Sequence, residues 1–268
     1  MNNPLISIIV PCFKQAQYLS ESLQSVLEQT YTNWECIIVN DGSPDNTSTV
    51  SEKWVTKDNR FIYLYKENGG LSSARNFGIE HAKGEFILPL DADDKIGINY
   101  IDLAIKSFYN NDSLKLVYCK AEKFGEEFGD WILQPFSIYD ICRFNMIFCS
   151  AVFRKKDWVL ACGYDINLIY GLEDWEFWIS ILKNGGAVKC LNYVGFYYRI
   201  RSNSMARIIN VEERQFSTQY VAKKHIEFFI KNYDFLNNNR KNNEIMLKSE
   251  KFILNIFTKK FLGFKFFK

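Results

Sequence analysis

The sequence lacks the features that define several large classes of protein. No apolar stretch approaches the roughly 18 residues needed to cross a bilayer, and residues 1–10 have neither the basic start nor the long apolar run of a signal peptide. The formal net charge is only +2, so no overall field would attract nucleic acid. The seven cysteines form no Cys-x-x-Cys pair and no cluster with histidine. We therefore expect a cytoplasmic protein with reduced, mostly buried thiols and no nucleic-acid partner.

Glycine is missing from the segment that follows the first apolar run, between Pro11 and Leu19. A sugar-phosphate nucleotidyltransferase would need a glycine-rich loop at this point. No Gly-x-Gly-x-x-Gly fingerprint occurs either, which argues against a nicotinamide dehydrogenase. The sequence thus disfavours two classes of nucleotide-dependent enzyme.

The composition is that of a folded protein with an unusual tail. Of the 268 residues, 47% are hydrophobic and 16% aromatic, which is enough to build a full core. Residues 240–268 contain eight Lys or Arg and two Glu, so this segment carries +6 and the remainder about −4. A basic, aromatic tail on a nearly neutral body suggests a partner at that end.

The first 95 or so residues alternate between β-rich runs and helical patterns, which predicts an α/β fold with a parallel sheet and right-handed crossovers. The predicted strands are residues 6–10, 34–39, 61–65 and 86–90. The second half is less regular. There we expect strands at 148–153 and 188–191 and helices at 173–182 and 211–232.

Three positions coincide with the carboxyl ends of the predicted strands: Pro11, Asp41 and Asp91. Ligands of parallel α/β sheets bind beyond these ends. The coincidence therefore places a candidate ligand site at this edge of the sheet.

Asp91-Ala92-Asp93-Asp94 puts three carboxylates within four residues, directly after an apolar strand. They would repel one another unless a cation lay among them. Hard oxygen ligands suit Mg²⁺ or Mn²⁺, which would bridge a diphosphate. An acidic turn that caps the next helix is the alternative.

Asp41 and Arg75 are candidate nucleotide contacts. Asp41 would accept a hydrogen bond from a nucleobase N–H, and Phe13 would offer a stacking face beside the backbone of Pro11. Arg75 would pair with base, ribose or phosphate. The alternatives are an ordinary Asp-Gly turn, a core aromatic and a solvated helix face.

Glu173 and Asp174 open an aromatic-rich helix, where a carboxylate screened from water by rings such as Trp175 would make a general base. Acidic residues also complement the dipole at a helix N-terminus, which alone would explain them. Further on, Arg199 and Arg201 stand in a short polar loop suited to diphosphate oxygens, unless it is simply a basic surface loop.

Taken together, these segments resemble the family 2 glycosyltransferases, an inverting group with a GT-A-type nucleotide-binding fold. The resemblance covers about residues 5–206. It is carried in order by Ser7-Ile8-Ile9-Val10-Pro11-Cys12-Phe13, Asn40-Asp41-Gly42-Ser43, Gly69-Gly70-Leu71-Ser72-Ser73-Ala74-Arg75-Asn76, Leu90-Asp91-Ala92-Asp93-Asp94 and Gly171-Leu172-Glu173-Asp174-Trp175.

The resemblance implies roles for individual residues. It gives nucleotide binding to Pro11, Phe13, Asp41, Arg75 and Asp91. It makes Asp93 a metal ligand with Asp94 beside it, and Asp174 the catalytic base. Contacts with diphosphate or acceptor fall to Glu173, Trp175, Arg199 and Arg201. Many family members carry a histidine, a possible metal ligand, where this chain has Arg201. Because arginine cannot ligate a metal, a diphosphate contact is expected there.

By the same resemblance, residues 1–206 form the GT-A domain, with a nucleotide-binding half at about 1–98 and an acceptor half at about 99–206. The implied reaction moves a sugar from a nucleotide-diphosphate donor, with uracil as the expected base, to an acceptor hydroxyl with inversion, in bacterial surface-polysaccharide synthesis. A non-catalytic sugar-nucleotide-binding or scaffold protein on this fold is the alternative. It would be expected to have lost Asp93 or Asp174, and both are present.

Residues 207–268 are expected to form a helical extension. Its last part has apolar residues at helical spacing with lysines between them: Ile253, Ile256, Phe257, Phe261 and Phe264. This pattern suits a helix lying on an anionic membrane, and equally a final helix packed on the body. On the membrane interpretation, the protein would work at the inner face of the cytoplasmic membrane on a lipid-linked glycan.

Overall fold

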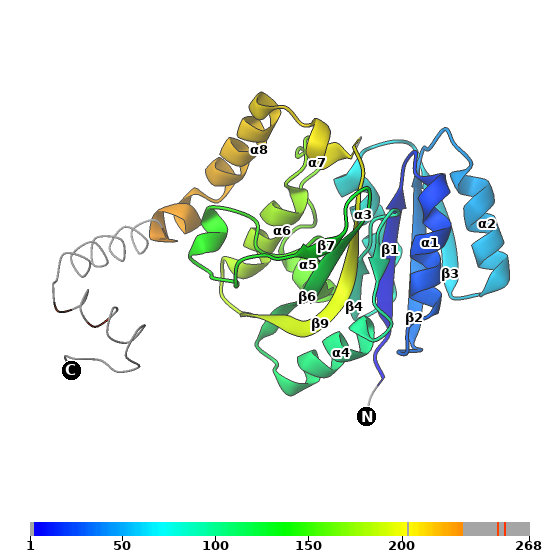
Figure 1. Cartoon of the computed structure of the whole chain (residues 1–268), viewed down its shortest axis with the longest axis horizontal. Coiled ribbons are helices and arrows are strands. Elements are labelled where there is room, and N and C mark those ends of the chain that lie inside the picture. The colour runs from blue at the N-terminus through cyan, green and yellow to red at the C-terminus, as the bar shows by residue number, and fades with distance from the viewer. Residues whose placement is uncertain (1–2, 203, 233–250, 252–254, 256–268) are drawn as a thin grey trace.

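The computed structural model describes residues 3–202, 204–232, 251 and 255, which contain a nine-stranded sheet flanked by helices (Figure 1). The strands are β1 (Ile6–Cys12), β2 (Trp34–Asp41), β3 (Phe61–Lys66), β4 (Phe86–Pro89), β5 (Lys95–Ile96), β6 (Leu114–Gly125), β7 (Gly129–Trp131), β8 (Val152–Arg154) and β9 (Ala187–Ile200). The helices are α1 (Ala16–Leu27), α2 (Thr47–Lys57), α3 (Leu71–His81), α4 (Tyr100–Asn110), α5 (Lys155–Leu160), α6 (Glu173–Leu182), α7 (Met205–Ile208) and α8 (Val211–Lys224). The predicted α/β class is confirmed.

The first half is a parallel sheet, as predicted, and its strands follow the order β3-β2-β1-β4. Every residue of β1 and β2 is buried, which is the mark of parallel strands covered on both faces. Helix α3 packs against both strands. Gly78 permits its close approach, because a Cβ there would stand 2.6 Å from Cγ2 of Ile9 and 2.9 Å from Cγ2 of Val39.

The second half makes the sheet mixed rather than mostly parallel. Strand β8 pairs antiparallel with both β4 and β6, whereas β6 pairs parallel with β9. Strand β9 is far longer than the predicted run at 188–191, and β8 starts later than the predicted strand at 148–153. Helices α4 and α5 and strands β5, β6 and β7 were not predicted. The pairing of β6 with β9 contains register shifts, which break the alternation on which sequence patterns depend.

The predicted helix at 211–232 is interrupted at His225. Helix α8 begins at a capping box formed by Asn210 and Glu213 and ends against α6. There, Lys224 Nζ lies 2.9 Å and His225 Nε2 2.6 Å from Oε1 of the fully buried Glu176. This contact fastens the start of the C-terminal extension to the helix that begins with Glu173 and Asp174.

The basic tail lies largely outside the described residues, and with it the predicted amphipathic pattern at 253–264. Among the residues that the structure describes, no helix combines the length and the apolar character needed to cross a bilayer.

Candidate active site

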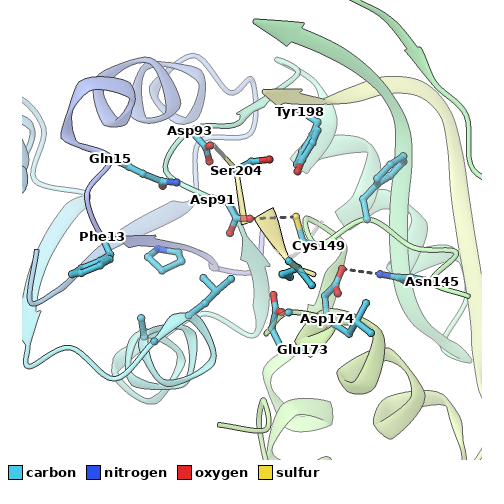
Figure 2. A pocket seen from close by; sticks show the side chains of 18 of the residues that line it. Phe13, Gln15, Asp91, Asp93, Asn145, Cys149, Glu173, Asp174, Tyr198 and Ser204 are labelled. Carbon is cyan, nitrogen blue, oxygen red and sulfur yellow. Dashed lines mark hydrogen bonds between the residues drawn. The ribbon is translucent and has the colours of Figure 1, made fainter. Parts of the chain in front are cut away.

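A cavity of about 550 Å³ opens at the carboxyl ends of β1, β2 and β4, with the N-terminus of α6 on its opposite wall. This volume is within the usual range for sites that bind small molecules. In Figure 2, Phe13, Gln15, Asp91 and Asp93 lie on one side and Asp174 on the other. The predicted site residues that line the cavity are Pro11, Phe13, Asp41, Asp91, Asp93, Glu173, Asp174 and Arg201.

Asp41, the last residue of β2, is buried and holds the loop that leads into α3. One carboxylate oxygen accepts hydrogen bonds from Lys66 Nζ (2.7 Å) and Gly69 N–H (3.0 Å). The other accepts from Asn68 Nδ2 (3.1 Å) and Gly70 N–H (2.9 Å). Gly70 has a φ of +85°, a conformation that favours glycine. Asp41 thus fixes the loop that forms this part of the cavity wall.

Phe13 directly follows β1 and is 40% exposed, with Pro11 beside it on the cavity wall. An exposed aromatic ring at the end of a buried strand leaves a face free for stacking. The base slot expected at Pro11 and Phe13 stays a prediction.

Arg75 does not line the cavity, contrary to the expectation of a nucleotide contact. It is only 1% exposed, and its two terminal nitrogens each donate over 2.7 Å, one to Asp91 Oδ1 and the other to Glu173 Oε1. Burial opposes its charge, but the two carboxylates raise the pKa of Arg75 well above its ordinary value. A buried cation needs such partners. Arg75 therefore links the acidic turn, residues 91–94, to the start of α6.

The acidic turn after β4 fits a cation. Asp93 and Asp94 are buried, and Asp94 Oδ2 has no hydrogen-bond partner in the described part of the chain. Burial and the neighbouring charges of Asp93 and Asp91 raise the pKa of Asp94 well above its ordinary value. Buried carboxylates so close together gain most from a positive charge. The repulsion between these carboxylates and the unpartnered oxygen among the described residues make the turn a candidate site for a divalent cation.

Cys149 is a cavity residue that sequence reasoning missed. Its thiol donates a hydrogen bond of 3.7 Å to Asp91 Oδ2, and Figure 2 shows it between Asp91 and Asp174. One ligand atom from each of Asp91, Asp94 and Cys149 lies within 4.8 Å of the others. No local signal links Cys149 to the acidic turn, because 58 residues separate Cys149 from Asp91.

Arg199 also differs from expectation, because it holds the turn instead of lining the cavity. Its backbone N–H donates to Asp94 Oδ1 (2.8 Å), and its Nε donates to the backbone oxygen of Asp93 (2.8 Å). Its guanidinium packs against the rings of Tyr18 and Phe124 and pairs with a glutamate of α1. Arg199 thus fixes the end of β9 against the acidic turn.

Asp174 opens α6 from the opposite wall. Its Oδ2 accepts a hydrogen bond from Asn145 Nδ2 (2.8 Å), which the sequence did not indicate (Figure 2). Burial and the charge of Glu173 raise the pKa of Asp174 to about 7. Leu172, just before the helix, has a φ of +68°, which is costly for a residue with a side chain. This kink turns the two acids toward the cavity, and a pKa near 7 suits a general base.

Trp175 is a core residue and not a cavity residue. It is 3% exposed, and its indole N–H donates to the backbone oxygen of Ile141 over 2.6 Å. The expected contact of Trp175 with diphosphate or acceptor is therefore replaced by packing beneath α6.

Comparisons with known proteins show the family to which the chain belongs. A family model described as glycosyl transferase family 2 matches residues 7–173. An uncharacterised glycosyltransferase of Rickettsia typhi is 42% identical over 193 residues, which are 68% of this chain and 59% of the relative. Glycosyltransferase GlyG of Streptococcus pneumoniae is 40% identical over 121 residues, 40% of each protein. The chain thus spans only about half the length of the curated relatives it matches.

Solved structures share the fold at low sequence identity. The S. aureus protein TarS, residues 1–349 in complex with UDP, has a TM-score of 0.67 at 19% identity, covering 91% of this chain and 75% of that one. The mannosyltransferase PcManGT of Pyrobaculum calidifontis, in complex with GDP-Man and Mn²⁺, has a TM-score of 0.61 at 19% identity, covering 76% and 59%. The GT-A-type architecture expected from the sequence is confirmed.

Proposed function

The chain belongs to glycosyl transferase family 2, and on that premise we propose that it transfers a sugar from a UDP-sugar donor to an acceptor hydroxyl with inversion. One observation carries the proposal. Asp174 is partly buried, its pKa is raised to about 7, and it lies across the cavity from the acidic turn at residues 91–94, where a buried carboxylate oxygen has no partner among the described residues.

Asp174 would accept the proton of the acceptor hydroxyl as the hydroxyl oxygen forms its bond to the anomeric carbon. The bond from that carbon to the diphosphate oxygen breaks, and its electron pair leaves with the nucleoside diphosphate. Attack opposite the leaving group inverts the anomeric centre in one step. Asn145 would keep the Asp174 carboxyl turned toward the acceptor through its 2.8 Å hydrogen bond.

The acidic turn would hold Mn²⁺ or Mg²⁺ through Asp93, with Asp91 and Asp94 beside it. When bound, such a cation would neutralise the charge of the departing diphosphate. Arg201, which lines the cavity, would donate to diphosphate oxygens. Support for a cation comes from the Asp94 oxygen that has no partner among the described residues and from the Mn²⁺ in the complex of the mannosyltransferase PcManGT.

The nucleotide would lie over Pro11 and Phe13 with its base toward Asp41. The complexes of TarS with UDP and with UDP-GlcNAc support uracil as the base. Because Asp41 already accepts four hydrogen bonds, a base N–H would have to share one of its oxygens.

The acceptor would enter along the wall that carries Asp174. The cavity lining is rich in rings and aliphatic side chains, among them Trp131, Leu133, Ile147, Phe148, Phe196 and Tyr198. Aromatic faces suit the apolar faces of sugar rings. A glycan or lipid-linked glycan of a bacterial surface polysaccharide is the acceptor we propose. We assign catalysis to residues 1–206 and place it in the cytoplasm. Contact with the membrane is assigned to the tail within residues 207–268.

A panel of sugar nucleotides with Mn²⁺ tests the proposal by thermal stabilisation and by slow hydrolysis of the donor. We expect a UDP-sugar to stabilise the protein only when metal is present, and EDTA to abolish the effect. Asp93→Asn should weaken this stabilisation, whereas Asp130→Asn, an exposed carboxylate of β7, should not. Binding without hydrolysis or transfer would favour the non-catalytic alternative. If no sugar nucleotide binds, the proposal fails.

A further inference from the structure

Arg201 occupies the carboxylate that the cation would use. Its terminal nitrogen lies 2.6 Å from Asp93 Oδ2, and the two side chains are only 13% and 10% exposed. Such shielding from water makes the pair stronger than an ordinary surface ion pair. Asp93 therefore already has a positive partner before any ligand enters.

A divalent cation at Asp93 would compete with this partner. It would share the carboxylate whose Oδ2 already binds the guanidinium, and the positive charge of the guanidinium would repel it at so short a range. The backbone near Arg201 is held in place, because the backbone N–H of Arg199 binds Asp94 and its Nε binds the backbone oxygen of Asp93. The side chain of Arg201, and not its backbone, would therefore have to move away when a cation binds.

The guanidinium of Arg201 can also donate hydrogen bonds to a second, negatively charged partner. Arg201 Nε is buried without a hydrogen-bond partner among the described residues, although the side chain lines the cavity. A diphosphate offers several charged oxygens, and arginine binds such groups through two parallel hydrogen bonds. A phosphate at this place would satisfy donors that Asp93 leaves unused.

We propose that Arg201 is an internal counter-ion of Asp93, which a metal ion replaces when a nucleoside diphosphate draws the guanidinium away. Metal and diphosphate then bind cooperatively, and the metal alone binds weakly. The inference rests on the proposed donor site but concerns the coupling between its two ligands. Coupling of this kind is reciprocal, so each ligand tightens the other by the same factor.

Electron paramagnetic resonance of free Mn²⁺ measures the metal affinity without any turnover. For the wild-type protein, we expect UDP to tighten Mn²⁺ binding at least about tenfold, which corresponds to about 1.4 kcal/mol. Arg201→Gln should bind Mn²⁺ alone about tenfold more tightly than wild type does. It should also lose most of the tightening by UDP.

Arg207→Gln is the matched control, because it removes a nearby but more exposed arginine that pairs with Glu127 and not with the acidic turn. It should behave as wild type does. Arg201→Lys keeps a positive charge, so it should retain weak Mn²⁺ binding and thereby separate loss of charge from local damage to the fold.

Unchanged Mn²⁺ affinity in Arg201→Gln, with a normal thermal melt, would overturn the counter-ion proposal even if UDP binds. An equal gain in Arg207→Gln would overturn it too, because the effect would then be one of general charge. Failure of the wild-type protein to bind UDP with any metal would instead remove the donor site itself.

Discussion

Replacing Asp174 by Asn separates proton transfer from the rest of the site. The amide has nearly the same shape and can still meet Asn145 at the 2.8 Å contact, but it cannot take a proton from an acceptor. General-base help is worth about 10²–10⁴-fold in rate. We expect turnover at saturating donor to fall by that factor, while the affinity for UDP and Mn²⁺ changes less than about threefold, since Asp174 lies on the opposite wall from the acidic turn (Figure 2).

The same substitution should stabilise the fold in alkaline solution. A pKa raised from 3.8 to about 7 means that the folded state holds a proton that the unfolded chain has released. The stability that Asp174 contributes to the wild-type protein is therefore lost as pH rises from about 4 to 7, whereas the Asn variant has no such loss. At about 1.36 kcal/mol per pH unit this amounts to at most about 4 kcal/mol, less in practice because the carboxyl is only partly buried.

Two assays check these expectations. Steady-state transfer gives kcat, with Asp102→Asn on α4, an acid paired with Lys106, as the control. Urea unfolding at pH 5 and pH 8 gives the stability difference, which should grow with pH and level off above about pH 7. Near-normal kcat in the variant would refute the base assignment. A stability difference that stays constant between pH 5 and 8 would refute the raised pKa.

Three further predictions concern residues that hold the site together. Arg75→Met leaves Asp91 and Glu173 without their shared cation and should cost about 3–5 kcal/mol in urea unfolding; a loss below 1 kcal/mol would show that the ion pairs contribute little. Asn145→Leu removes a hydrogen bond that lowers the pKa of Asp174, so the rise of kcat/KM with pH should move to higher pH; an unmoved profile would contradict this link. Gly78→Ala forces a methyl group against β1 and should cost about 1–3 kcal/mol; a melt like that of wild type would mean that α3 shifts freely.

The first half of the chain could be predicted from sequence because each of its signals is local. Strand β1 is a run of apolar residues, and the residues that matter for ligands follow such runs directly, as Asp41 and Asp91 do. Parallel strands then bring these ends together without further information. The second half gave weaker signals, because β6 and β9 mix buried and exposed residues and pair through register shifts.

The orientation of charged side chains could not be predicted in the same way. Arg75, Arg199 and Arg201 look alike in sequence, yet only Arg201 lines the cavity. The position of each arginine is decided by its acidic partners. These lie 16 and 98 residues away in the sequence for Arg75, and more than 100 residues away for Arg199 and Arg201. A basic residue near an acidic motif is therefore a candidate for two opposite roles, ligand contact or internal counter-ion, until the pairing is known.

The pairing also shows which acids at the site lack a positive partner. Within the described ranges, Asp41, Asp91, Asp93 and Glu173 each have a Lys or Arg at ion-pair distance. Two further acids at the site, Asp94 and Asp174, have none, and burial raises the pKa of both. A divalent cation would stabilise the charged form of Asp94. The carboxylate of Asp174 would instead take the proton of an acceptor hydroxyl and become neutral, as its raised pKa allows. Both carboxyls without a positive partner therefore lie where the proposed reaction needs them.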